Sequence, residues 1–225
     1  SGWLTPVFEP KRYRTWFFVA ELPEGQRTRD VSTESDQVVW LPVLRAVEQA
    51  EDREILMLPP TYITTLDVDA TVNAAAPSLG GGGGVDGAIH EAAGPELVRA
   101  SRALGPIRAG SAVLTPGFRL KARYVVHAVG AIWTGGWERE PELPERAYES
   151  SFQCAHATGT IRTIAFPAIS AGVYRFPKER AAEIAVRAMR RHEAKFTRIV
   201  ACAFDEAMGA LYRLLLRREA STSHP

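Results

Sequence analysis

From residue 67 onward, short apolar runs alternate with segments whose apolar residues recur at helical spacing. The runs predict strands near residues 70–74, 113–114, 124–129, 164–166 and 199–203. Apolar residues three or four positions apart predict helices over residues 85–93, 95–100, 181–189 and 211–215. Strands that alternate with helices form a sheet covered on both faces, so we expect an α/β/α sandwich.

The first 60 residues have a different pattern, with many prolines and several aromatic residues. Residues 16–20 and 38–41 predict two short strands, separated by a turn at 23–25 and a polar stretch. The pair Pro59–Pro60 interrupts the chain, and we expect the main boundary there. A segment of this length rarely buries enough surface to fold alone. It should therefore form a β-rich extension that packs on the larger domain.

Composition and charge exclude several classes of protein. The 225 residues are 46% hydrophobic and 24% charged, as in an ordinary globular domain. With 27 basic and 26 acidic side chains, a surface for duplex nucleic acid is not expected. Two cysteines cannot form a disulfide framework or, by themselves, a four-ligand zinc site. No apolar stretch is long enough to span a bilayer and no signal peptide is found, so we expect a cytoplasmic protein without a membrane partner.

A glycine run is the first candidate for chemistry. Residues 80–84 are all glycine, and they lie between a predicted strand and a predicted helix. Glycines let backbone N–H groups turn toward a ligand, and the start of a helix favours an anion. Neither a P-loop nor a spaced dinucleotide fingerprint is present. The pattern fits an anion site, and it also fits a flexible surface loop.

The second candidate is the small-residue loop over residues 166–174, which also lies between a strand and a helix. Ligands of α/β sheets bind beyond the carboxyl ends of the strands. Two such loops can face each other across one cleft, and two backbone concavities suit a diphosphate. An ordinary connecting loop is the alternative interpretation.

Taken together, these segments closely resemble a macrodomain of the MacroD type. The resemblance covers residues 61–218 in the correct order and rests on residues 67–75, 82–90, 92–97, 115–118, 126–130, 165–174 and 202–206. It implies a three-layer α/β/α macrodomain with a mixed central sheet over residues 61–218, followed by a tail at 219–225.

What the resemblance implies about function is an ADP-ribose pocket. Asp86 would orient or activate a water for the removal of ADP-ribose from acidic side chains or for hydrolysis of O-acetyl-ADP-ribose, without a metal or other cofactor. The ligand would be ADP-ribose or an ADP-ribosylated protein. The residues expected to contact it are Ile63, Asn73, Gly82, Gly83, Gly84, Val85, Ile89, Ser170, Ala171, Gly172, Val173, Tyr174 and Phe204.

The chain departs from the family pattern at two positions. Ala76 stands where the family has a second asparagine that bonds the distal ribose, and Tyr62 stands where it has an aspartate that holds the adenine. Each lost hydrogen bond costs roughly 0.5–1.5 kcal/mol. Three functions therefore stay open: a slow ADP-ribosyl hydrolase, a non-catalytic ADP-ribose reader, and an interaction scaffold.

The first 60 residues resemble the second half of a Nudix hydrolase. The resemblance rests on residues 3–6, 12–20, 23–26, 39–41 and 57–61, but the Nudix box that would hold magnesium is absent. We therefore expect a catalytically silent extension. Residues 55–58 could supply a first strand to the macrodomain sheet.

Other reactive side chains are given structural roles. His127 lies in an apolar strand and is expected to be a core histidine, and His90 in the first turns of a helix is also expected to be structural. Cys154 and Cys202 fit buried, inert thiols. The arginines at 187, 190 and 191 should form a solvated helix face.

Overall fold

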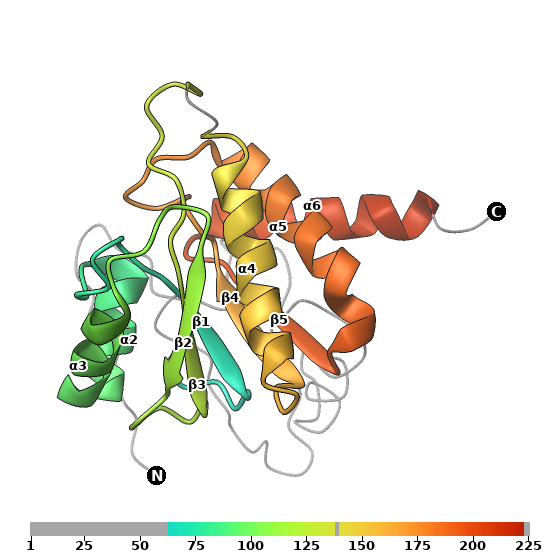
Figure 1. The fold of residues 1–225 in the computed structure, drawn as a ribbon. Helices are drawn as coiled ribbons and strands as arrows, with labels where there is room; N and C mark the ends of the chain where they lie inside the picture. The colour runs from blue at the N-terminus through green and yellow to red at the C-terminus, as the bar shows by residue number, and fades with distance from the viewer. Residues whose placement is uncertain (1–62, 138–139, 223–225) are drawn as a thin grey trace, which may run out of the picture. The chain divides into compact units, whose positions relative to one another are not determined.

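Five short strands form a single mixed sheet in the computed structural model, which describes residues 63–137 and 140–222. The strands are β1 (Ala70–Ala74), β2 (Ala112–Pro116), β3 (Tyr124–Ala128), β4 (Thr163–Pro167) and β5 (Arg198–Cys202). Their order across the sheet is β2-β3-β1-β4-β5, and only β2 runs antiparallel to its neighbour (Figure 1). The strands predicted from residue 67 onward and the mixed sheet are confirmed.

Helices cover both faces of this sheet. They are α2 (Gly84–Ala93), α3 (Pro95–Leu104), α4 (Leu143–Ala157), α5 (Lys178–His192) and α6 (Glu206–Thr222), with a short 3-10 turn, η2 (Glu193–Lys195). In Figure 1, α2 and α3 lie on one side of the strands and α4, α5 and α6 on the other. The predicted three-layer sandwich is confirmed, whereas helix α4 was not predicted.

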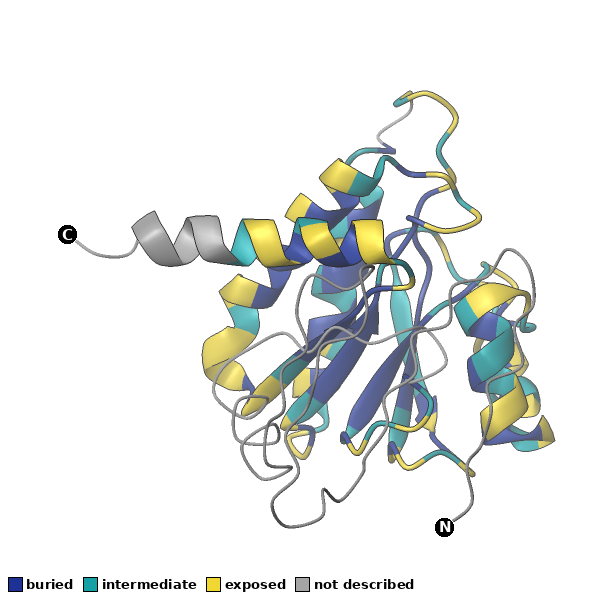
Figure 2. Ribbon diagram, turned by 180° about the vertical axis from the view of Figure 1, so that it is seen from behind, coloured by how far each residue is buried: buried dark blue, intermediate teal, exposed yellow. Residues whose placement is uncertain are grey.

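The face toward α4, α5 and α6 is apolar throughout. Val72, Val126, Ile164 and Phe166 project from neighbouring strands into one buried cluster with Phe152 of α4 and residues of α5 and α6. Aromatic packing is dense here, because the rings of Phe152 and Phe166 have centroids 4.7 Å apart. Figure 2 shows most of the strand residues dark blue and the outer sides of these helices largely yellow. Burial of this cluster is the main hydrophobic contribution to the fold.

The opposite face of the sheet combines apolar and polar side chains. Val125 and Ala165 pack with Ile89 of α2 and Leu97 of α3 in a second cluster. Four buried polar residues lie on the same side, because side chains of a strand alternate between its faces: Thr71, Asn73, Thr115 and His127. Buried polar groups need partners, so this face holds the candidate chemistry.

Helices α4 and α5 are joined by ion pairs that the sequence did not predict. Arg191 contacts both Glu145 and Glu149 of α4, and Arg187 Nη2 lies 3.4 Å from Glu145 Oε2. The two arginines are still about half exposed. The predicted solvated helix face is therefore present, and its arginines also form ion pairs with α4. Exposed pairs contribute little to stability, typically below about 1 kcal/mol each.

The two cysteines are free thiols. Cys202 is buried as predicted, and burial raises its pKa to about 12. Cys154 is only half buried and donates a hydrogen bond to the Ala112 carbonyl at 3.3 Å, while burial raises its pKa as well. Both shifts disfavour the reactive thiolate, in agreement with inert thiols.

Several predictions concern residues that the structure does not describe. The β-rich extension over residues 1–60, its resemblance to a Nudix hydrolase, the strand at 55–58 and Tyr62 all lie outside the described residues. Within residues 63–137 and 140–222, no helix is both long and apolar enough to cross a membrane.

Candidate functional site

The glycine run leads directly from strand β1 into helix α2. Gly83 is the N-cap of α2, and no side chain caps the helix, so the N–H groups of its first turn point outward without an intrahelical partner. Among the described residues, none accepts a hydrogen bond from the backbone N–H of Gly81, Gly82 or Gly83. The loop therefore offers a series of free donors next to the positive end of a helix dipole.

The loop after β4 is fixed to the loop after β3. The backbone N–H of Ala131 donates to Ser170 Oγ at 2.9 Å, and that of Trp133 donates to the Tyr174 carbonyl at 2.9 Å. Ser170 has a positive φ of 68°, a conformation that non-glycine residues rarely adopt. The Ser170 hydroxyl accepts this bond and so positions the loop, while its own O–H can still donate to a ligand.

Two backbone donors of the same loop stay free. Within the described part of the chain, no group accepts from the N–H of Gly172 or Val173, whereas the N–H of Ala171 donates to the Ala168 carbonyl at 3.4 Å. The Val173 side chain is 83% exposed, so it stands on the surface of the loop. Of the predicted contact residues here, Gly172 and Val173 have free N–H groups for a ligand, whereas the Tyr174 carbonyl is bonded to the Trp133 N–H.

Asp86 is the predicted catalytic residue, and its two carboxylate oxygens have different surroundings. Oδ1 accepts a hydrogen bond from Asn73 Nδ2 at 2.7 Å and lies 3.3 Å from His90 Nε2. Oδ2 faces the glycine loop, because a Cβ on Gly82 would lie only 3.1 Å from it. The residue as a whole is 5% exposed. One oxygen is thus held by the protein, and the other is directed at the loop.

The hydrogen bonds continue from Asn73 into the sheet. Asn73 Nδ2 also lies 3.2 Å from His127 Nδ1, and His127 Nε2 lies 2.9 Å from Thr115 Oγ1. Burial lowers the pKa of His127 to about 4, helped by His90 and opposed by Asp86. The predicted core position of His127 is confirmed, and the ring is neutral near pH 7.

His90 was expected to be structural, but it lies in the candidate site. Its side chain is 11% exposed, it contacts Asp86 one helical turn earlier, and its ring centroid is 5.9 Å from that of His127. The four-residue spacing of Asp86 and His90 on a helix could have predicted this contact. Neither ring nitrogen of His90 has a well-aligned hydrogen bond with a described residue.

Other predicted contact residues are not all brought to the same place. Ile63 and Ile89 are 1% and 0% exposed and belong to the core under α2, so neither has surface for a ligand. Phe204 is 46% exposed, and the Lys178 ammonium lies 5.2 Å from the centre of its ring. Lys178 Nζ is also 2.5 Å from Asp205 Oδ2, which ties the beginning of α5 to the beginning of α6.

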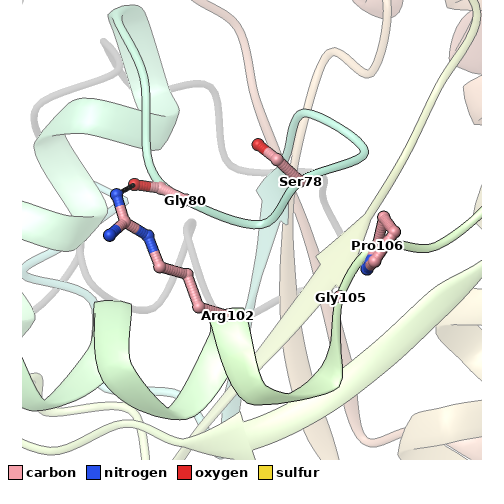
Figure 3. Close-up of a pocket in the computed structure, with 5 residues that line it drawn as sticks. All are labelled: Ser78, Gly80, Arg102, Gly105 and Pro106. Carbon is pink, nitrogen blue, oxygen red and sulfur yellow. Dashed lines mark hydrogen bonds between the residues drawn. The ribbon is translucent and has the colours of Figure 1, made fainter.

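A hollow of about 500 Å³ lies beside the glycine run on the α3 side (Figure 3). It is lined by Ser78, Gly80, Arg102, Gly105 and Pro106, and Arg102 Nη2 donates to the Gly80 carbonyl at 3.4 Å. None of the predicted contact residues lines this hollow, and Asp86 does not reach it. Among the described residues, no group of three or more His, Cys, Asp or Glu side chains could hold a metal ion.

Comparison with known proteins assigns the family. The family model of the Macro domain matches residues 72–185, which includes the glycine run, Asp86 and the loop after β4. The chain belongs to the Macro domain family. Its Macro domain is 55% identical over 154 residues to the Macro domain-containing protein RSc0334 of Ralstonia nicotianae, covering 68% of this chain and 90% of that protein. It is 50% identical over 161 residues to the O-acetyl-ADP-ribose deacetylase of Klebsiella pneumoniae, covering 68% and 91%.

Solved structures agree with this assignment. The Macro domain superposes on the Oceanobacillus iheyensis macrodomain with ADP at a TM-score of 0.66 and 34% identity, covering 71% of this chain and 88% of that one. The Trypanosoma brucei macrodomain in complex with ADP-ribose matches at a TM-score of 0.64 and 35% identity, covering 71% and 68%. The predicted Macro domain fold is therefore confirmed.

Proposed function

We propose that this Macro domain binds ADP-ribose and hydrolyses esters of its distal ribose, as a metal-independent enzyme of the MacroD type. Its substrates would be ADP-ribosylated acidic side chains of a protein or O-acetyl-ADP-ribose. Support comes from relatives about half identical that are named O-acetyl-ADP-ribose deacetylase and from similar macrodomains solved with ADP or ADP-ribose.

The diphosphate would bind between the glycine loop and the loop after β4. Free N–H groups of Gly82 and Gly83 on one side, and of Gly172 and Val173 on the other, match the oxygens of two linked phosphates. The uncapped start of α2 adds partial positive charge for the anion. Neither loop needs a lysine or arginine side chain for this purpose.

The adenosine would extend toward the exposed ring of Phe204. Phe204 lies at the junction of α5 and α6. There its ring contacts the Lys178 ammonium, which also pairs with Asp205. An aromatic ring of this kind can pack on a base or a sugar. Discrimination of adenine should be looser than in the family because Tyr62 replaces the aspartate.

The observation that carries the proposal is the orientation of Asp86. Its Oδ2 faces the glycine loop, while Oδ1 is held by Asn73. Oδ2 can accept a hydrogen bond from a water and take its proton as the water oxygen attacks the ester carbonyl. The acyl–oxygen bond then breaks, and the ribose oxygen takes that proton and becomes a hydroxyl again. The acyl group leaves as a carboxylic acid, which loses its remaining proton to solvent. Holding the water in place supplies much of the rate enhancement.

A second function is favoured by Ala76. It lies four residues before the glycine run, and its methyl group cannot bond the distal ribose as the family asparagine does. If this loss prevents productive orientation of the ester, the domain binds ADP-ribose without turnover. We expect slow turnover instead, because the groups that hold the diphosphate and the water are all retained.

The test is release of ADP-ribose from a mono-ADP-ribosylated protein and of acetate from O-acetyl-ADP-ribose. Asp86→Ala should lower both rates by roughly 100-fold or more, as expected for the loss of a general base, with ADP-ribose affinity within about threefold. Glu91→Ala is the matched control, since Glu91 is an exposed carboxylate of the same helix. EDTA should leave the rates unchanged.

Each other outcome has a distinct meaning. Binding of ADP-ribose without release by the parent chain would make the domain a reader. An unchanged rate in Asp86→Ala would remove Asp86 from the mechanism. If calorimetry shows no binding of ADP-ribose or ADP, the proposed function is wrong.

A further inference from the structure

The amide of Asn73 is the link between Asp86 and the interior of the sheet. Asn73 is completely buried, and its single Nδ2 donates to Asp86 Oδ1 while also lying 3.2 Å from His127 Nδ1. An amide nitrogen has two hydrogens, one for each of these partners. Asn73 Oδ1 accepts no hydrogen bond from any described residue. Among those residues, the contacts of Nδ2 alone therefore fix the orientation of the amide.

The charge of Asp86 sets which way this amide faces. If the amide were turned over, Asn73 Oδ1 would lie where Nδ2 now is, 2.7 Å from a carboxylate oxygen. Two acceptors at that distance in a buried place repel each other strongly. The present orientation requires an acceptor on the other side as well, because the second hydrogen of Nδ2 points at the His127 ring.

His127 supplies that acceptor only in one of its neutral forms. Nδ1 can accept from Asn73 when the ring proton is on Nε2, and Nε2–H then donates to Thr115 Oγ1 at 2.9 Å. In the other form, Nδ1–H would meet the Asn73 N–H. The Asn73 N–H thus selects the form of His127 that is protonated on Nε2, and the Thr115 hydroxyl supplies the acceptor that this Nε2–H needs. Asp86 and His90 are the titratable groups that act on His127 electrostatically, and burial keeps it neutral.

We propose that Thr115 and His127 are positioning residues for Asp86, acting through the Asn73 amide. This inference rests on the proposed function, because its effect is to keep Oδ1 engaged and Oδ2 directed at the glycine loop. Thr115 is on β2, His127 on β3, Asn73 on β1 and Asp86 on α2, so three neighbouring strands control one carboxylate. Thr115 and His127 are both buried, so neither side chain presents surface to a substrate.

Two substitutions of Thr115 separate this role from packing. Thr115→Val keeps the shape and removes the hydroxyl, whereas Thr115→Ser keeps the hydroxyl and removes the methyl group. We expect Thr115→Val to lower kcat about tenfold with KM and the ADP-ribose Kd within about twofold, as for a misoriented catalytic group. Thr115→Ser should retain most of the kcat. The reverse order would assign Thr115 to packing and overturn the proposal.

Ser151→Ala is the matched control for loss of a buried hydroxyl. Ser151 is also completely buried, but it lies on α4, on the opposite side of the sheet. Its hydroxyl donates to the Ala147 carbonyl of the same helix and, among the described residues, to no other group. Its removal should leave both kcat and KM unchanged. A tenfold fall in kcat here would show that any buried hydroxyl produces the effect, which would also overturn the proposal.

Nitrogen-15 NMR of the histidine rings tests the inference without any catalysis. In the parent chain, the His127 signals should show Nε2 protonated and Nδ1 unprotonated at pH 7, assigned by their loss in His127→Gln. In Thr115→Val the Nδ1-protonated form should become populated. A His127 ring protonated on Nδ1 in the parent chain would overturn the positioning role of Thr115 and His127. The NMR result does not depend on catalysis. If the parent chain releases no ADP-ribose, only the proposed function is refuted.

Discussion

Gly130 and Ser170 approach each other so closely that no side chain fits between them. A Cβ on Gly130 would lie 2.0 Å from Ser170 Oγ and 2.8 Å from Ile169 Cγ2. Gly130 lies two residues after the end of β3 and precedes Ala131, whose N–H bonds the same Ser170 hydroxyl. The contact holds the loop after β4 against the loop after β3, and so sets the position of the N–H groups of Gly172 and Val173.

Gly130→Ala should therefore displace the loop after β4. We expect ADP-ribose affinity to fall about tenfold and the free energy of unfolding to fall by about 1–3 kcal/mol, as for overpacking. Calorimetry and urea denaturation measure the two effects. Gly159→Ala is the control, because Gly159 has a positive φ of 67° in a turn after α4 and should lose stability without losing affinity. Normal affinity in Gly130→Ala would mean that the two loops are not coupled.

Ala76→Asn should raise turnover. The added amide can bond the distal ribose, and one well-placed hydrogen bond contributes roughly 0.5–1.5 kcal/mol, or about a twofold to tenfold rate increase. Ala76→Leu, with a side chain of similar size but no amide, should give no increase. Steady-state release of acetate from O-acetyl-ADP-ribose measures the difference. Equal rates in the Asn and Leu variants would exclude this position from ribose binding.

His127 should make the fold less stable in mildly acidic solution. Its folded-state pKa of about 4 is below the ordinary value of 6.5, so the folded chain binds fewer protons than the unfolded chain in this window. The stabilisation is complete above pH 6.5 and is lost as the pH falls toward 4. His127→Gln should lose less unfolding free energy over this range than the parent chain does. His156→Gln, at an exposed position, should lose as much as the parent chain. Parallel curves for His127→Gln and the parent would contradict the assignment.

Asp69 should add a second loss of stability at lower pH. Burial opposes its ionisation, but hydrogen bonds from the N–H groups of Arg162 and Thr163 and from the Arg123 guanidinium lower its pKa to about 2. The stabilisation is present above about pH 4 and is lost as the pH falls through 2.

The test for Asp69 is urea denaturation between pH 7 and pH 2. Asp69→Asn should cost roughly 1–2 kcal/mol at pH 7 and much less at pH 2, because charged hydrogen bonds are lost only where the carboxylate is ionised. Asp67→Asn, two residues earlier and exposed, is the control. A cost that does not change with pH would show that the charge of Asp69 is not what stabilises the fold.

Much of the fold could be predicted because its strands are short apolar runs and most of its helices have a clear apolar face. Helix α5 is an example, since Ala181, Ile184, Ala185, Ala188 and Met189 were predicted on one face and all are buried. Helix α4 was missed because its buried face includes Ser151 and two alanines, and a serine or alanine gives little hydrophobic signal. Its larger buried residues, Tyr148 and Phe152, occupy that face as well.

The site was predictable only in part. The resemblance identified Asp86 and both loops, and alternation along the strands puts Asn73 and His127 at inward positions. Which residue of β3 lies beside Asn73 depends on strand register, which in this sheet pairs Asn73 with His127. A parallel register is set by packing across the whole sheet, and a single sequence does not reveal it. For the same reason, the different surroundings of the two Asp86 oxygens could not be predicted.

The two faces of the sheet have an evolutionary consequence. Side chains toward α4, α5 and α6 are all apolar, and those toward α2 and α3 include the polar residues that surround Asp86. Substitutions near Asp86 can therefore change the reaction while the larger apolar cluster keeps the chain folded. Ala76 fits this picture, because it lies in the loop after β1 and outside that cluster. Such a fold can lose, regain or alter its catalysis by single changes without first losing its structure.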